Sequence, residues 1–374
     1  MFLQIHTLTS YPASLLNRDD AGLAKRIPFG NATRLRVSSQ CLKRHWRENL
    51  TQALSDVPDG LRTRSFFTRA VLPHVIRAGV PEDLAGKLSE TLAKAVVRGG
   101  VKEGGDLNQP ILFGQREADY FVDMLVTAHR EANPIQALTE RLKSKEETQN
   151  LAAMSKSAAG LTAALFGRMV TSDLLARVDA PVHVAHAFTV HPAQAEMDYF
   201  TVVDDLNRDD EMGAAHANQT ELGAGVYYGY VTVDMPLLVS NLTGSERGEW
   251  KKQDAAAPRR VLQALIHAIT RQSPGAKLGS TAPYSYADLV LLEAGTQQPR
   301  TLANAFLEAV KPHSDLRQQS AQRMADYLQK IDRMYGATAK VRTLSTHLDA
   351  QPFVPLTPKP VDDAIQQILD AIWE

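Results

Sequence analysis

The stretch 32–47, ATRLRVSSQCLKRHWR, joins an alternating segment to a helical one and holds five Lys and Arg residues but no acidic residue. The acid-free window runs from 21 to 47 and contains seven Lys and Arg residues. At the average of the whole chain, a window of this length holds about three. Because the net charge of the chain is −1 at pH 7, the excess of positive charge is local, and it indicates a polyanion as partner.

The alternation within 33–38 predicts a strand. In that strand Arg34 and Arg36 point to one face and are followed on it by Ser38, while Leu35 and Val37 face the core.

A helix is expected to begin near Gln40, with Ser39 as its N-cap. Its buried stripe consists of Leu42, Trp46 and Leu50 or Ala53, and Lys43 and Arg47 share an exposed face. The strand arginines, the free N–H groups at the helix start and the Lys43/Arg47 pair then converge on one place, which suits a phosphate. On composition alone, a solvated amphipathic helix with ordinary surface arginines is the alternative.

Length and composition indicate a globular protein. A chain of 374 residues with 44% apolar content predicts two or three domains, or one core with large insertions. The N-terminus has no basic region before an apolar stretch, and the most apolar segment, 158–167, is too short to span a bilayer. The single cysteine, Cys41, excludes an internal disulfide framework. We therefore expect a cytoplasmic protein without membrane contacts.

The chain alternates between strand-like and helical segments. Strands are expected at 2–9, 33–38, 182–190, 226–235 and 288–293, and the stretch from about 50 to 180 is helical in pattern. Strands separated by helices predict a compact α+β sheet domain with a helical insertion. There is no phosphate-binding loop motif, and GAGVYYG at 223–229 enters a strand rather than a helix, so no nucleotide cofactor is expected.

Several short motifs occur in a fixed order along the chain. They are Asn17-Arg18-Asp19-Asp20, Phe29-Gly30, Arg36-Val37-Ser38-Ser39-Gln40 with Lys43-Arg44, Gly167-Arg168-Met169, Ala185-His186-Ala187, DYFTVVDDL at 198–206, GVYYGY at 225–230, PGAK at 274–277 and LANAFLEAVK at 302–311. Together they resemble the backbone (CasC-type) subunit of the type I-E CRISPR surveillance complex, Cascade.

The resemblance implies the right-hand architecture of the repeat-associated mysterious protein superfamily. An RRM-like (ferredoxin-like) palm is expected at 1–50, 180–195 and 225–374, a helical fingers insertion at 51–179, and a β-hairpin thumb at 196–224. The palm strands lack the aromatic residues of ribonucleoprotein motifs, so base stacking by the sheet is not expected.

In this family several copies stack head to tail along a CRISPR RNA, and the thumb flips out a base at regular intervals. The resemblance therefore implies guide-RNA contacts by Arg18, Lys25, Arg34, Arg36, Ser38, Gln40, Lys43, Arg47, Met169 and Lys277. In the thumb it points to Phe200, Thr201, His216 and Ala217. The other implied partners are the remaining Cascade subunits and target DNA, which pairs with the guide.

Two of these assignments have alternatives. Met169 lies on an apolar helix and is either a core residue or a contact to the bases. In the fingers, Arg141 and Lys145 share a helix face with Lys143 nearby, and this face is either a track for target DNA or simply solvated.

His183, His186 and His191 lie close together in sequence and superficially suggest a metal site. In a strand, however, His183 and His186 point to opposite faces, and no cysteine or acidic ligand sits at metal spacing. We therefore expect no metal.

The expected function is a non-catalytic RNA-binding scaffold of a ribonucleoprotein complex in antiviral defence. The alternative is a ribonuclease of the same superfamily that cuts bound RNA with Asp19 or Asp20, with or without a metal. A third possibility is a general single-strand binder outside CRISPR systems.

Overall fold

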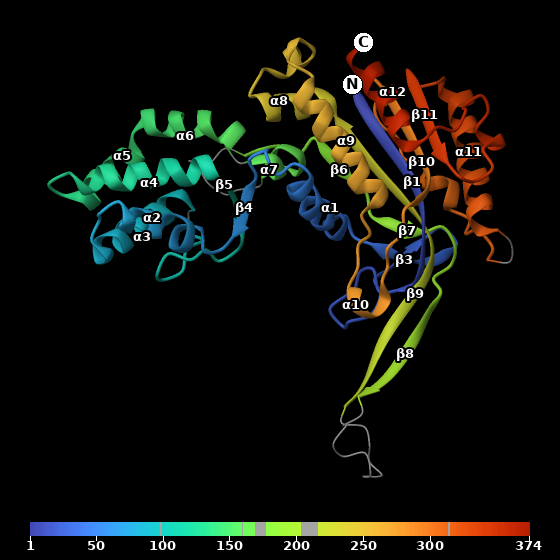
Figure 1. The fold of residues 1–374 in the computed structure, drawn as a ribbon, viewed down its shortest axis with the longest axis horizontal. Coiled ribbons are helices and arrows are strands. Elements are labelled where there is room, and N and C mark those ends of the chain that lie inside the picture. Colours follow the sequence, from blue (N-terminus) through green and yellow to red (C-terminus); the bar gives the residue numbers. More distant parts are fainter. Residues whose placement is uncertain (98, 159, 169–176, 203–215, 313–314) are drawn as a thin grey trace. The chain divides into compact units, whose positions relative to one another are not determined.

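The structure of the chain is a computed structural model that describes residues 1–97, 99–158, 160–168, 177–202, 216–312 and 315–374 (Figure 1). The chain forms two compact units. Unit 1 comprises Met1–Ala53, His183–Val233 and Arg259–Glu374, and unit 2 comprises Leu54–Val182 and Asp234–Pro258. In the described part of the chain, no helix is long and apolar enough to span a membrane.

Unit 1 is built on one sheet in which several neighbouring strands, such as β1 and β10, come from distant parts of the sequence (Figure 1). The strand order is β11-β10-β1-β9-β7-β3-β2, and β6 and β8 also pair with β9. The bounds are β1 Phe2–Ser14, β2 Arg26–Phe29, β3 Ala32–Val37, β6 Val182–Val184, β7 Ala187–Thr189, β8 Ala195–Val202, β9 His216–Asp234, β10 Ala287–Gly295 and β11 Val341–Thr346. The pairs β1–β10, β10–β11, β2–β3, β3–β7, β7–β9 and β8–β9 are antiparallel. The strands predicted at 2–9, 33–38, 226–235 and 288–293 are confirmed.

Helices cover both faces of this sheet. α11 (Leu316–Tyr335) and the 3-10 turn η3 (Ala303–Phe306) pack on one face, in a buried cluster that includes Leu8, Tyr228 and Leu291. On the other face lie α1 (Ser39–Ala53), α9 (Ala256–Arg271) and α12 (Val361–Trp373). Because both faces are covered, every residue of β1 from Leu3 to Thr9 is buried, polar residues included.

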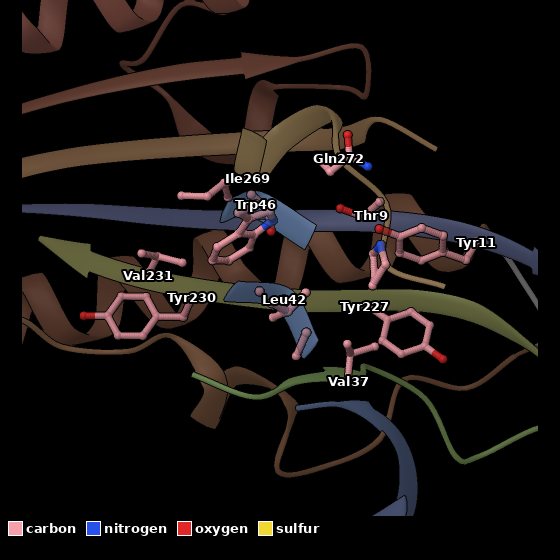
Figure 2. Close-up of a pocket in the computed structure, with 14 residues that line it drawn as sticks. Thr9, Tyr11, Val37, Leu42, Trp46, Tyr227, Tyr230, Val231, Ile269 and Gln272 are labelled. Atoms are coloured by element: carbon pink, nitrogen blue, oxygen red, sulfur yellow. The ribbon is translucent and has the colours of Figure 1, made fainter. Parts of the chain in front are cut away.

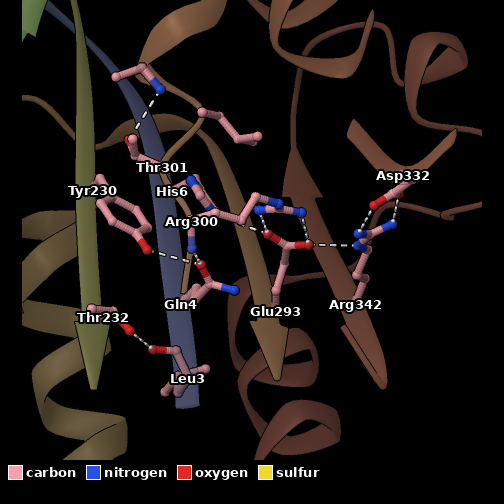
Figure 3. Close-up of polar contacts among 12 residues, drawn as sticks. Leu3, Gln4, His6, Tyr230, Thr232, Glu293, Arg300, Thr301, Asp332 and Arg342 are labelled. Atoms are coloured by element: carbon pink, nitrogen blue, oxygen red, sulfur yellow. Dashed lines mark hydrogen bonds and ion pairs between the residues drawn. The ribbon is translucent and has the colours of Figure 1, made fainter. Parts of the chain in front are cut away.

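Buried polar side chains of β1 find their hydrogen-bonding partners in a network of polar and charged residues (Figure 3). His6 lies 3.0 Å (Nε2–Oε2) from Glu293, whose carboxylate also accepts hydrogen bonds from Arg300 and Arg342. Arg342 continues the network to Asp332 on α11, with Nη2 at 2.8 Å from Oδ1. Burial raises the pKa of Glu293, but the hydrogen bonds from His6 and Arg300 outweigh this, so the pKa lies below its usual range. The network holds β1, β10, β11 and α11 together.

Unit 2 is mainly helical and has its own core. Its elements are the strand pair β4 (Gly60–Thr63) and β5 (Ile111–Gly114), a π-helical turn η1 (Phe66–Val71), α2 (Leu72–Arg77), α3 (Glu82–Val96), α4 (Gln115–His129), α5 (Pro134–Lys143), α6 (Lys145–Ala158), α7 (Gly160–Phe166), α8 (Met235–Thr243) and the 3-10 turn η2 (Arg247–Lys252). Phe66 and Phe113 stack with ring centroids 4.0 Å apart in this core. The Arg168 guanidinium makes a buried ion pair with Glu117 at 2.7 Å, and Glu117 also accepts a hydrogen bond from the Gly114 amide.

Residues 234–258 lie in unit 2, although the sequence assigns them to the palm. The Asp234 carboxylate accepts a hydrogen bond from the Leu237 amide at 3.1 Å and so begins α8. From α8, the Asn241 side chain donates hydrogen bonds to the carbonyls of Ala164 and Asp179 at 3.1 and 3.0 Å. These contacts tie the segment to α7 and its neighbourhood, a long-range arrangement that local sequence patterns do not encode.

Candidate nucleic-acid interface

Four segments from three distant parts of the sequence meet at the base of the β8–β9 hairpin of unit 1. They are the loop 15–26, the start of α1, the base of the β8–β9 hairpin, and the loop 273–286. Ala276 donates a backbone hydrogen bond to Leu15 at 2.8 Å, and the Lys277 ammonium reaches the Thr220 hydroxyl on β9. The Asn17 side chain accepts a hydrogen bond from the Ser38 amide at 2.9 Å. These contacts bring the basic 21–47 window to the base of the hairpin.

Glu221 holds the loop 15–26 in place from β9. Its carboxylate accepts a hydrogen bond from the Ala24 amide at 2.6 Å and forms an ion pair with Arg26. Glu221 is 6% exposed, whereas the Arg26 side chain is 37% exposed, so the carboxylate is buried and its ion pair lies at the surface. The sequence reasoning missed Glu221. The available signal was an acidic residue in the predicted hairpin at 196–224, opposite in charge to the acid-free window at 21–47.

A cluster of positive charge surrounds His186, in the two-residue break between β6 and β7. Arg36 Nη1 lies 3.0 Å from His186 Nδ1, and Arg36 Nε donates to the Arg26 carbonyl at 3.3 Å. Partial burial lowers the pKa of His186, and the charges of Arg36, Lys25 and Lys43 lower it further. Lys25, Arg36, Lys43 and His186 are named here the His186 cluster. Three members of the cluster, Lys25, Arg36 and Lys43, are predicted RNA contacts. The sequence suggested the fourth, His186, only as a possible metal ligand.

The start of α1 matches the prediction in outline. The Ser38 hydroxyl accepts a hydrogen bond from the Cys41 amide at 3.3 Å, so Ser38 rather than Ser39 caps the helix. Ser38 is 6% exposed and has a structural role, whereas Gln40 is exposed.

The buried face of α1 is the predicted stripe of Leu42, Trp46 and Leu50. Leu42 and Trp46 point from α1 toward β1 and β9 (Figure 2). The space between them and the strands is a cavity of about 40 Å³, room for a water but not for a nucleotide. Lys43 and Arg47 lie one turn apart and are half-buried, on the flank of α1 beside its buried stripe, whereas the exposed Arg44 and Glu48 lie on the opposite side.

Arg34 departs from the expectation of an exposed arginine pair. It does share a strand face with Arg36, but it is 0% exposed. Its Nη1 donates to the Thr189 carbonyl at 3.1 Å and its Nη2 to the Phe306 carbonyl at 2.7 Å. Burial lowers the pKa of Arg34, and the nearby Arg323 lowers it further. The guanidinium thus joins β3 to β7 and η3 and is not available to RNA, because η3 covers this part of the strand face.

The remaining predicted contacts have varied positions. Arg18 and Lys277 are exposed, and Lys277 begins the short helix α10 (Leu278–Thr281) with a positive φ of 55°. The Asp19 carboxylate accepts hydrogen bonds from the Ala21 and Leu23 amides at 3.0 and 2.9 Å, which orders the loop. Asp20 is exposed.

The predicted hairpin at 196–224 has an antiparallel backbone. Phe200 pairs with Asn218, Thr201 with Ala217 and Val202 with His216. Two predictions concern residues that the structure does not describe: Met169 and the hairpin tip at 203–215 both lie outside the described ranges.

Of the three basic residues expected to share a face in the fingers, Arg141 is paired with a carboxylate, whereas Lys143 and Lys145 are exposed. The Arg141 Nε atom donates to Glu147 at 2.8 Å, and Glu147 also accepts from the Tyr120 hydroxyl. Arg141 is therefore tied to unit 2's own carboxylate. Lys143 and Lys145 are exposed.

The three histidines do not form a metal site. His191 is buried, its Nδ1 lies 2.8 Å from the Pro192 carbonyl, and its Nε2 accepts a hydrogen bond from the Val226 amide at 3.3 Å. His183 and His186 are exposed. Within the described ranges, no group of three or more His, Cys, Asp or Glu side chains is placed to hold a metal ion.

Comparison with known proteins identifies the family. The model of the CT1975-like protein family matches residues 3–371. The chain belongs to this family. A solved chain from a "CRISPR RNA-guided surveillance complex, pre-nicking" is similar over 99% of this chain and 100% of its own length, with 25% identity and a TM-score of 0.80. A chain from a "CRISPR RNA-guided surveillance complex" covers 100% of both chains with 22% identity and a TM-score of 0.64, which shows the shared fold.

The resemblance to a Cascade backbone subunit that the motifs predict is confirmed by these matches. No curated protein sequence matches this CT1975-like chain.

Proposed function

We propose that this CT1975-like protein is the non-catalytic backbone subunit of a CRISPR surveillance complex, binds CRISPR RNA through the His186 cluster and α1, and stacks head to tail along the RNA. The guide is thereby presented for pairing with target DNA in antiviral defence. The observation that carries the proposal is the convergence of the acid-free 21–47 window with the hairpin base and the Lys277 loop, in a chain that matches a surveillance-complex subunit along its full length.

The architecture supports a palm, fingers and thumb. When β2, β3, β6, β8 and α10 are left aside, the elements of unit 1 up to β10 occur in the β-α-β-β-α-β order of ferredoxin-like folds, namely β1, α1, β7, β9, α9 and β10. In the sheet, four of these strands lie side by side in the order β10-β1-β9-β7. Unit 2 supplies the fingers, and the β8–β9 hairpin supplies the thumb. Among the described residues, the central strands β1 and β10 are buried almost throughout and offer no surface for base stacking. We therefore assign the RNA contacts of the basic window to phosphates, which position the strand but carry no sequence information.

The non-catalytic assignment is supported by the role of Asp19, whose carboxylate orders its own loop through two backbone amides. The test is incubation of the purified protein with end-labelled guide RNA, complementary RNA and magnesium. A retarded complex with intact guide and target is expected. Cleavage of either strand that is lost in the Asp19→Asn or Asp20→Asn variant would instead support the ribonuclease.

A further inference from the structure

The contact between Arg36 and His186 fixes the protonation state of the histidine. Arginine is always protonated and has no acceptor, so the guanidinium is the donor in the 3.0 Å contact and His186 Nδ1 is the acceptor. His186 is therefore neutral here, with its proton on Nε2. An imidazolium has no acceptor nitrogen, so protonation of His186 and the Arg36 hydrogen bond exclude each other.

The charges that act on His186 come from three elements. Arg36 belongs to β3, Lys25 to the loop before β2, and Lys43 to α1. Within the described part of the chain, these three cations are the charged groups that act on His186. Glu221, which anchors this loop, is engaged by Arg26 and the Ala24 amide. The cluster thus presents three positive charges and one neutral imidazole, and a fourth positive charge is disfavoured until an anion arrives.

We propose that His186 is a phosphate ligand of this cluster and that it takes up one proton from solvent when a phosphodiester of RNA binds. The phosphodiester oxygens accept the Arg36 hydrogen bond in place of Nδ1, which frees that nitrogen to be protonated. The negative charge of the phosphate then offsets the repulsion among Lys25, Arg36, Lys43 and the imidazolium. This inference rests on the proposed function, because the guide RNA supplies the phosphate.

The exposure of His186 makes it a suitable site for substitution, since a change there leaves the core intact. Gln at position 186 accepts the Arg36 hydrogen bond and remains neutral at every pH. His183, an exposed histidine on β6 three residues away, provides the matched control.

The experiment measures the affinity of a single-stranded RNA of fixed length at pH 6, 7 and 8 and constant ionic strength. The proteins compared are the wild type, His186→Gln and His183→Gln, with thermal unfolding as a check of folding. The ratio of wild-type affinity to His186→Gln affinity is expected to rise as the pH falls, by at most about tenfold per pH unit for one proton. His183→Gln is expected to follow the wild type.

Calorimetry in two non-phosphate buffers of different ionisation enthalpy gives an independent measure. The apparent binding enthalpy of the wild type is expected to depend on the buffer, and that of His186→Gln to do so less, by close to one proton. If RNA binds but the two proteins share one pH profile and one buffer dependence, the role of His186 is overturned while the proposed function stands. If the wild type binds no RNA at any of these pH values, both are overturned.

Discussion

Arg300 donates two hydrogen bonds to the Glu293 carboxylate, from Nη1 to Oε2 at 2.7 Å and from Nη2 to Oε1 at 2.9 Å (Figure 3). The Glu293 carboxylate is 0% exposed, so its charge depends on these donors. Replacing Arg300 with Met removes one partner of a buried pair and is expected to lower the free energy of unfolding by about 3–5 kcal/mol. Urea denaturation measures the loss. Arg317→Met is the control: Arg317 is half exposed and 3.7 Å from Asp288, so a change below about 1 kcal/mol is expected. Equal losses in both variants would contradict the special role of Glu293.

His6 gives this network a pH dependence. Its Nε2 lies 3.0 Å from the Glu293 carboxylate and its Nδ1 2.9 Å from the Tyr228 hydroxyl. Burial, together with the charges of Arg300 and Arg342, lowers the pKa of His6 more than Glu293 raises it, which favours the neutral ring in the folded chain. As the pH falls below about 6.5, the unfolded chain binds a proton at this position before the folded chain does, so stability decreases. The His6→Gln variant is expected to lose less stability than the wild type between pH 7 and pH 5. Parallel urea midpoints across this range would exclude the effect.

Arg34 and Arg36 share a strand face but are expected to respond differently to substitution. Arg34→Met leaves the Thr189 and Phe306 carbonyls without their donor and is expected to cost about 2–4 kcal/mol of stability. Arg36→Met is expected to change stability by only about 0.5 kcal/mol. It should instead lower the salt slope of RNA binding by about 0.7, the contribution of one phosphate contact on a single strand. Thermal unfolding and filter binding distinguish the two roles, and a reversed pattern would show that Arg34 is the RNA contact.

This pair also shows how far local sequence determines the site. Alternation places both arginines on one face of β3, and it does so correctly. What covers that face is η3, some 270 residues later in the chain, and no local pattern encodes that contact. The same holds for Glu221 and for the attachment of 234–258 to unit 2, which depend on side chains meeting across long sequence separations.

The buried side of α1 could be predicted from the sequence because apolar residues recur there with the period of a helix. The helical spacing of Leu42, Trp46 and Leu50 selects the buried side of α1. The same spacing places Lys43 and Arg47 together on one flank of that side, where both are half-buried. The strand at 182–190 was less predictable. It is interrupted at Ala185 and His186, and this break is what places His186 beside Arg36.

The Lys43/Arg47 pair is expected to contribute to RNA affinity through phosphates alone. Replacing both residues with Ala removes up to two contacts, so the slope of log affinity against log salt should fall by about 1.4. The loss should be the same for spacers of different sequence and one length, because phosphates carry no sequence information. Arg44→Ala is the control on the same helix, since Arg44 pairs with Glu48 at 3.0 Å and is exposed. A filter-binding series with an unchanged slope in the double variant would remove α1 from the interface.

The proposed assembly predicts how copy number depends on RNA length. Because phosphate contacts do not depend on base sequence, a copy can bind at any position along the guide. A head-to-tail interface joins two different surfaces of neighbouring copies, so the array has no intrinsic end. Its length is then set by the RNA or by other subunits. Free copies carry a concentrated positive surface around the His186 cluster, whose mutual repulsion the RNA neutralises as it aligns them. Native mass spectrometry with guides of increasing length should show bound copies rising in steps, with a constant nucleotide increment per copy. A fixed copy number on guides of different length, or a closed ring formed without RNA, would show that the protein sets the count.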